Sequence, residues 1–419
     1  KLFSEVPAGY EIPMRLTKEL VNKKTGYMLN IGDYAYSLEP QVNLGAEDNV
    51  GMNCSADFII RSMERKTTDK PIAIFLDGYQ YHRDRIGKDL AQRMFVNRSG
   101  NFLTWSLTWR DVEQGFTPKK THFENYLTSG DTARVKQINE WLNRSSLEKF
   151  IGIETRSSLQ WLTSYLAKIQ KDPKQADPNK PSMEELWKKF AFFRALGYFN
   201  LKPSNREREH QAWSYKAEEA LPLGLFQVIE GVDLPVMSGL FEPEHEDMDK
   251  PVRLFVTAAQ QSISKQLADD VYMACVLSDD MKNLQTGPFV SIWAGFLRLQ
   301  NLFQFLPNAF FLTTGKIKEG YYDNISSLWT DVAPVESSTQ VKDAQEWERV
   351  VKYSPNMKAA FEALSHLGWS VPESPYELVD SKGMVVAQAN FAWEDRKVAI
   401  LNKYEEEFLP QFENAGWRV

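Results

Sequence analysis

The amino-acid sequence predicts an α/β protein whose N-terminal part is a mixed sheet flanked by helices. Three observations predict this class. Short runs of β-branched and aromatic residues, separated by polar turns, fill the chain up to about residue 115. One of these runs, residues 72–76, is followed by an amphipathic stretch and then by a run at 102–109, an order typical of strand, helix and strand. From about residue 116 onward, helical periodicity dominates.

Local patterns predict each N-terminal element in order. Residues 42–60, VNLGAEDNVGMNCSADFII, indicate two strands around a polar turn that contains glycine. A charged turn at 64–70 leads to the apolar strand at 72–76. Residues 85–100 predict a helix that ends at Gly100, because four apolar side chains share one of its faces: Ile86, Leu90, Met94 and Phe95. We expect residues 1–116 to form one domain.

Residues 117–345 predict a middle region that is mostly helical. The expected helices lie at 132–142, 146–153, 158–169 and 182–199. Two strands, 253–257 and 271–277, precede an apolar helix at 289–306 that we expect to be buried between domains. The remaining stretches predict loops: a proline-rich one at 171–182, an acidic one at 242–249 that is either solvated or holds a cation, and a connector at 327–345.

The last segment, 346–419, resembles part of the first domain. Residues 388–402 align with 55–77, with Ala389-Asn390-Phe391 in the place of Ala56-Asp57-Phe58. In this alignment asparagine replaces aspartate both at Asn390 and at Asn402. A glycine-terminated helix and a strand follow in each copy. This segment is either a degenerate second lobe of the same kind or a coincidence of two short β-α-β patterns.

Composition restricts the function. The two cysteines, Cys54 and Cys275, predict a reducing cytoplasm and exclude a cysteine-rich zinc module. No apolar run is long enough to span a bilayer, and no signal peptide is evident. The net charge is −7, but residues 81–120 carry eight basic and four acidic side chains, which predicts a local basic patch. Because the chain begins at Lys1 rather than Met, we expect a processed product or a piece of something longer.

Asp57 and Asp77 are the candidate metal ligands. On adjacent strands, facing residues lie about 5 Å apart, so that two carboxylates can share a cation such as Mg²⁺. His82 is a candidate general base, and Glu39 a third acid. The predicted substrate-binding side chains are Gln80, Arg85, Lys88 and Arg93.

Each candidate also has a simpler interpretation. Asp77-Gly78 is a common turn pair, His82 can cap the following helix, and a glutamate before proline is usually on the surface. Asp57 is harder to explain in this way, because a carboxylate in a core strand requires a partner. We expect four tryptophans to lie in the core or at domain interfaces rather than to stack on bases: Trp105, Trp109, Trp293 and Trp393.

The stretches ADFII, PIAIFLDGYQYH, DLAQR and FLTWSL together resemble nucleases of the very-short-patch-repair type, a branch of the PD-(D/E)XK restriction-endonuclease-like fold. The resemblance covers residues 36–112 and includes an aspartate ending a strand (Asp57), glycine and histidine four residues apart (Gly78, His82), and the helix pair Asp89 and Arg93. It implies a restriction-endonuclease-like sheet and Mg²⁺-dependent DNA cleavage. The sequence departs from that pattern at Phe75, where an acid is expected, and it lacks the usual lysine.

A narrower resemblance is to the C-terminal region of large bacterial DEAD/DEAH-box helicases of antiphage defence systems of the Druantia kind. It is based on SLEPQVNLG, FLDGYQYHRDRIGKDLAQRM and FLTWSLTWRDV. It implies DNA and the rest of a helicase chain, or a partner subunit, as partners, and no membrane. The chain has no GxxxxGK[ST] motif, so we expect no ATP site in this segment.

Three functions remain open from the sequence. The chain could be a metal-dependent nuclease, a catalytically silent nuclease-fold module that binds DNA or docks a subunit, or a structural scaffold. The presence of Asp57, Asp77 and His82 favours the enzyme, whereas Phe75 and the net acidity favour the silent module.

Overall fold

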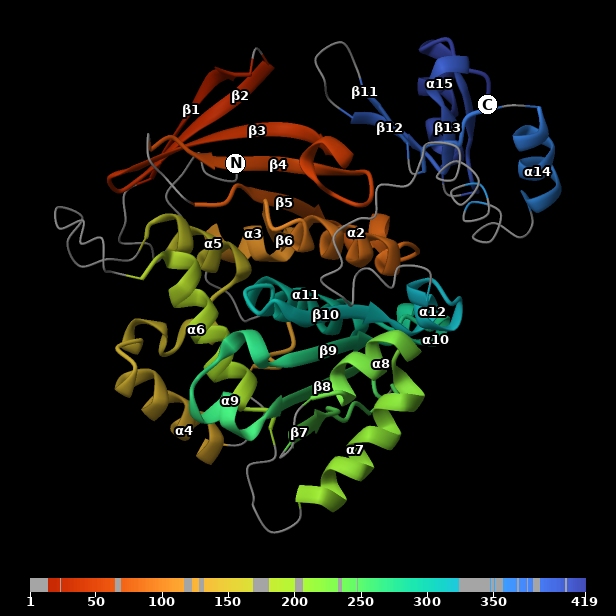
Figure 1. Ribbon diagram of the computed structural model, residues 1–419. Coiled ribbons are helices and arrows are strands. Elements are labelled where there is room, and N and C mark those ends of the chain that lie inside the picture. The colour runs from red at the N-terminus through yellow and green to blue at the C-terminus, as the bar shows by residue number, and fades with distance from the viewer. Residues whose placement is uncertain are drawn as a thin grey trace. The chain divides into compact units, whose positions relative to one another are not determined.

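The computed structural model describes residues 14–22, 24–64, 69–116, 123–127, 132–168, 181–199, 206–232, 236–246, 248–323, 347, 350, 357–367, 369–374, 376–379, 385–403 and 405–419. The chain divides into two compact units, residues 1–330 and 331–419. The N-terminal unit contains a six-stranded and a four-stranded mixed sheet with helices between and around them (Figure 1). The predicted mixed α/β class is confirmed, and neither sheet closes into a barrel.

The first sheet has its strands in sequence order. These are β1 (Met14–Val21), β2 (Lys24–Ile31), β3 (Tyr34–Leu44), β4 (Cys54–Ser62), β5 (Ile72–Asp77) and β6 (Leu103–Thr108). Neighbours are antiparallel except β5 and β6, which are parallel and joined by α1 (Tyr79–His82) and α2 (Ile86–Arg98). The predicted strands around 55–60, 72–76 and 102–109 and the helix at 85–100 are therefore confirmed. The hairpin of β1 and β2 was not predicted.

The edge of the sheet that β6 forms is covered by two amide side chains, one from α11 (Phe289–Phe303) and one from the residue after it. Asn301 accepts a hydrogen bond from the N–H of Ser106 and donates one to its carbonyl, both at 2.8 Å. Gln304 does the same to Thr104, at 2.7 and 2.5 Å. The side chains thus take the place of a neighbouring strand and satisfy backbone groups that burial would leave unpaired. This fixes the edge strand at whose end the candidate site begins.

The second sheet repeats the pairing pattern of β3 to β6. It contains β7 (Val236–Phe241), β8 (Val252–Ala259), β9 (Tyr272–Leu277) and β10 (Asn308–Thr313). The first three are antiparallel neighbours, and β10 is parallel to β9 after a crossover through α10 (Met281–Leu284) and α11. The strands and the apolar helix predicted here are confirmed. α2 packs on β10 and α11 packs on β6, so that these two helices lie between the sheets (Figure 1).

The other α-helices that the structure describes in this unit are α3 (Trp109–Phe116), α4 (Thr132–Arg144), α5 (Ser158–Leu166), α6 (Met183–Leu196), α7 (Arg206–Ala220), α8 (Leu223–Glu230), α9 (Gln260–Ser264) and α12 (Thr314–Lys318). Capping boxes start α5 at Ser157 and α6 at Ser182. The single helix predicted at 146–153 is wrong: a 3₁₀ turn at Glu148–Phe150 lies there, a second at Ile153–Thr155 begins at its end, and Gly152, with a φ of +79°, separates the two. Most of 171–182 and all of the connector 327–345 lie outside the described residues.

The C-terminal unit contains α14 (Lys358–His366), β11 (Tyr376–Val379), β12 (Val385–Ala389), β13 (Phe391–Trp393), β14 (Val398–Ile400) and α15 (Leu409–Asn414). β11 pairs antiparallel with β12, and β13 antiparallel with β14. After α15 the chain returns parallel to β14, through a bridge between Val398 and Arg418. β13, β14 and the segment around Arg418 therefore pair in the same order as β4, β5 and β6, but the register of the antiparallel pair differs. Phe58 pairs with Ile74, whereas Phe391 pairs with Ile400, which aligns with Phe75.

Candidate functional site

The candidate site lies where the parallel strands β5 and β6 end. β5 ends at Asp77, Gly78 precedes the single turn α1, and α2 begins four residues after it. Tyr79 fixes this turn, because its hydroxyl donates to the carbonyl of Leu284 at 2.6 Å and its ring contacts Trp293 at a centroid distance of 5.4 Å. With Tyr79 held against the second sheet's helices, the turn brings His82 back over the end of β5.

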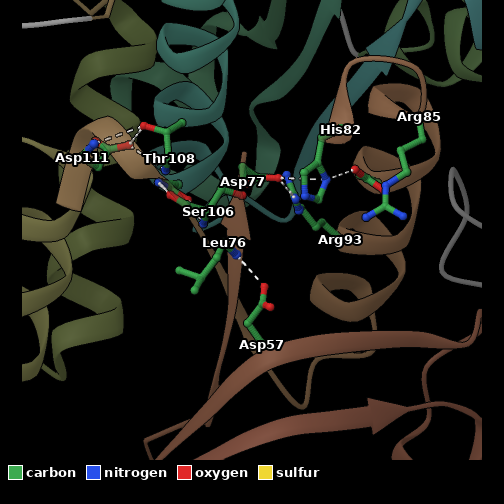
Figure 2. A network of polar contacts seen from close by, with 11 residues as sticks. Asp57, Leu76, Asp77, His82, Arg85, Arg93, Ser106, Thr108 and Asp111 are labelled. Carbon is green, nitrogen blue, oxygen red and sulfur yellow. Dashed lines mark hydrogen bonds and ion pairs between the residues drawn. The ribbon is translucent and has the colours of Figure 1, made fainter. Parts of the chain in front are cut away.

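Five ionisable side chains form a continuous network at this turn (Figure 2). Nη2 of Arg93 donates to Oδ1 of Asp77 at 2.5 Å. Nδ1 of His82 lies 2.6 Å from Oδ2 of Asp89 and 3.7 Å from Oδ1 of Asp77. Nε of Arg85 lies 3.7 Å from Oδ1 of Asp89. The network therefore joins the end of β5 to the first two turns of α2.

The inner half of the network is buried. The side chains of Asp77 and Arg93 are 1% and 3% exposed, and the Arg93 guanidinium lies 5.0 Å from the centre of the Phe75 ring. Burial raises the pKa of the Asp77 carboxyl, and the positive charges of Arg93 and His82 only partly offset this. For Asp89 burial acts in the same direction, but the hydrogen bond with His82 and the charge of Arg85 outweigh it and lower the pKa.

Asp77, His82 and Asp89 fit a divalent cation. One ligand atom from each lies within 4.8 Å of the others, the one such group of acidic, histidine or cysteine side chains found among the described residues. Oδ2 of Asp77 is buried and has no hydrogen-bond partner among the residues that the structure describes. A buried carboxylate oxygen without a donor is costly, and a cation would satisfy it. Two carboxylates and an imidazole suit Mn²⁺ or Zn²⁺ as well as Mg²⁺.

Asp57 lies outside this group. Its Oδ2 accepts a hydrogen bond from the backbone N–H of Leu76 at 2.6 Å, and Figure 2 shows it apart from the Asp77 and His82 side chains. The ladder between β4 and β5 runs only as far as the pair Phe58–Ile74, so the carboxylate replaces a strand partner for Leu76. This provides the partner that a carboxylate in a core strand requires.

The other predicted site residues lie on the turn or on α2, except Glu39, which lies two strands away from β5 and outside the site. Gln80 is exposed on α1, Lys88 is half-buried on α2, and Arg85 contacts Asp89 as described. Arg93 is buried against Asp77, where it holds that carboxylate. Glu39, in β3, accepts a hydrogen bond from Asn22 at 2.7 Å.

Two features of the site were missed from the sequence. Asp89 was recognised only as part of a helix signature, although its position in the first turn of α2, seven residues after His82, is what lets it reach the imidazole. Asp111 caps the end of β6: its carboxylate accepts from the N–H and hydroxyl of Thr108 and from the N–H of Ser158. An aspartate three residues after a threonine is the signal that predicts such a cap.

The tryptophan prediction is correct for three residues and wrong for one. Trp105, Trp293 and Trp393 are buried, but Trp109 is 64% exposed. β6 ends at Thr108 and α3 begins at Trp109, so Trp109 is the first residue of the helix and not part of the buried strand.

The described part of the acidic stretch 242–249 forms no metal-binding group, and Glu242 pairs with Lys216 at 2.9 Å. Among the helices that the structure describes, none combines the length and apolar character needed to cross a membrane.

No protein-family model, no curated protein and no solved structure matches this chain. What the site does must therefore be inferred from its own geometry.

Proposed function

We propose that this chain is a restriction-endonuclease-like protein that cleaves DNA phosphodiester bonds with a divalent cation held by Asp77, His82 and Asp89. The observation that carries the proposal is the buried Oδ2 of Asp77, which lacks a donor and belongs to a carboxylate beside an imidazole and a second carboxylate. The pairing of β3 to β6 supports it: three antiparallel strands, a helix and a parallel fourth strand are what the resemblance implies.

His82 is a ligand in this proposal rather than the general base. Its Nδ1 is the atom that lies near both carboxylates, at 2.6 and 3.7 Å. Arg93 positions Asp77, and Arg85 positions Asp89. Once bound, the cation would neutralise phosphate charge and lower the pKa of a bound water. Because the imidazole must lose its proton to bind metal, cation affinity rises with pH.

Cleavage of labelled DNA with Mg²⁺ or Mn²⁺ tests the proposal. Asp77→Asn and His82→Ala should each abolish metal-dependent cleavage, whereas Asp84→Asn, on the same turn and partly exposed beside Arg83, should cleave like the wild type. Equal cleavage by all four proteins would refute the assignment of the site. Far-ultraviolet circular dichroism of each variant separates loss of the site from loss of the fold.

A second function, DNA binding without cleavage, is favoured by a specific observation. Arg93 already places a positive charge on Asp77, and Asp57 is hydrogen-bonded to the backbone of Leu76. With Phe75 in the place of the expected acid, the charged residues of the turn would then stabilise a nuclease fold that has no catalytic activity. Tight DNA binding without cleavage under any metal would support this function.

Both functions are compatible with a protein that works together with a helicase. On the basis of the narrower resemblance, we propose that this chain acts in the cytoplasm on DNA, with the rest of a defence helicase or with a partner subunit. ATP would then be hydrolysed outside this chain. Co-purification with such a helicase in a phage-infected host would test this setting.

A further inference from the structure

Two large aromatic side chains are exposed at the edge of the sheet where the candidate site lies. Tyr81 is 75% exposed and Trp109 is 64% exposed. Asp77 and Thr108 are partners at the last register position of the parallel strands β5 and β6. Trp109 follows β6 directly, and Tyr81 lies in α1, four residues after the end of β5. A Cβ built on Gly78 would lie 3.1 Å from Cδ2 of Tyr81, so the tyrosine ring lies over the residue that follows Asp77.

Both aromatics stand on firmly held backbone. The turn that carries Tyr81 is anchored by Tyr79, and the N–H of Tyr81 donates to the carbonyl of Gly78 at 2.9 Å. Trp109 follows Thr108, which is fixed by the buried carboxylate of Asp111. The exposure of the two rings is therefore not caused by a frayed helix or strand end, and rigid elements hold them in place for a ligand.

Two arginines lie next to these rings in the sequence and favour a ligand that carries negative charge. Arg83, whose side chain is 50% exposed and whose Nε lies 3.5 Å from Oδ2 of Asp84, lies two residues after Tyr81, and Arg110 follows Trp109 directly. A flat apolar surface next to guanidinium groups matches a nucleobase next to a phosphate. In a duplex the bases stack on each other and their faces are covered, whereas in a single strand they are available.

We infer that Tyr81 and Trp109 form a stacking platform for the bases of single-stranded DNA, which is the substrate form presented to the site. The inference rests on the proposed function, because it takes the ligand to be a nucleic acid. It predicts a preference for unpaired DNA and dependence on the rings themselves.

Equilibrium binding measured by fluorescence anisotropy in EDTA tests the platform without cleavage. The probes are a labelled oligothymidylate, the same strand in a duplex, and an abasic strand with the same phosphates. Tyr81→Ala and Trp109→Ala should each weaken binding to the oligothymidylate about 5- to 150-fold. Tyr81→Phe should bind like the wild type because it keeps the ring. Tyr215→Ala is the matched control, since Tyr215 is 72% exposed on α7, which packs on the far strand β7.

The outcomes separate the two proposals. Wild-type preference for the oligothymidylate over both other probes, lost in the two alanine variants and kept in the control, supports the platform even if no metal yields cleavage. Unchanged binding in the alanine variants, equal binding of the abasic strand, or preference for duplex overturns it, even if Asp77-dependent cleavage is observed.

Discussion

Removing Arg93 should strongly destabilise the N-terminal unit in a pH-dependent way. Arg93 and Asp77 are joined by a 2.5 Å hydrogen bond and are 3% and 1% exposed, so Arg93→Met leaves a buried carboxylate without its charge partner. Breaking such a pair costs about 3–5 kcal/mol, or roughly 150- to 5,000-fold in the folding equilibrium. Methionine keeps the apolar contact with Phe75, so the loss reports on charge rather than on packing.

The direction of the pH dependence follows from the pKa of Asp77. Burial raises that pKa in the folded state, so the folded protein binds this proton more tightly than the unfolded chain does. The carboxyl therefore lowers stability as the pH rises from the unfolded value of about 3.9 through the folded pKa. Without Arg93 the folded pKa rises further, and the loss caused by Arg93→Met should be larger at about pH 7.5 than at about pH 4.5.

Urea unfolding at both pH values measures this difference. The double variant Arg93→Met with Asp77→Asn should recover most of the stability, because it removes both charges. A loss below about 1 kcal/mol, or an equal loss at the two pH values, would refute the view that the pair is a buried, mutually dependent charge pair.

Two further predictions concern other contacts. Asp89→Asn should lower the free energy of unfolding by about 1.5–3 kcal/mol at neutral pH, because it weakens the charged hydrogen bond to His82. Since the pKa of Asp89 is lowered in the folded state, this contribution is present above about pH 3.9 and disappears as the pH falls through the folded pKa. Urea unfolding measured as a function of pH tests this. Gly239→Ala should lower the free energy of unfolding by about 3 kcal/mol, because its Cβ would lie 2.0 Å from the carbonyl oxygen of Tyr198. Gly287→Ala, whose Cβ would have no atom within 4 Å, should leave the melting temperature unchanged. Equal melting temperatures of the two variants would contradict the packing of β7.

The sequence predicts the elements whose signals are local. β5, α2 and β6 are short runs with clear ends, and their order implies a parallel pair once a helix lies between the strands. β1 and β2 mix charged and apolar residues on an exposed hairpin, so their alternation is weak. In the second sheet the sequence predicts β8 and β9 but neither β7 nor β10; the parallel pair of β9 and β10 joins strands separated by α10 and α11, which no local window contains.

The site could be predicted only in part for a similar reason. Asp77 and His82 are close in sequence, and a strand end followed by a turn places them together. The role of Asp57 depends on where the ladder between β4 and β5 stops, a property of register that the residue types do not encode. The exposure of Trp109 depends on β6 ending at Thr108, one residue earlier than its apolar pattern predicts.

Mn²⁺ binding by electron paramagnetic resonance tests the central claim most directly. The account predicts one bound ion in the wild type and in Asp84→Asn, and loss of that ion in Asp77→Asn and in His82→Ala, with affinity increasing as the pH rises. Equal Mn²⁺ binding by all four proteins, or no binding by the wild type at any pH at which it is folded, would contradict a cation site at Asp77, His82 and Asp89.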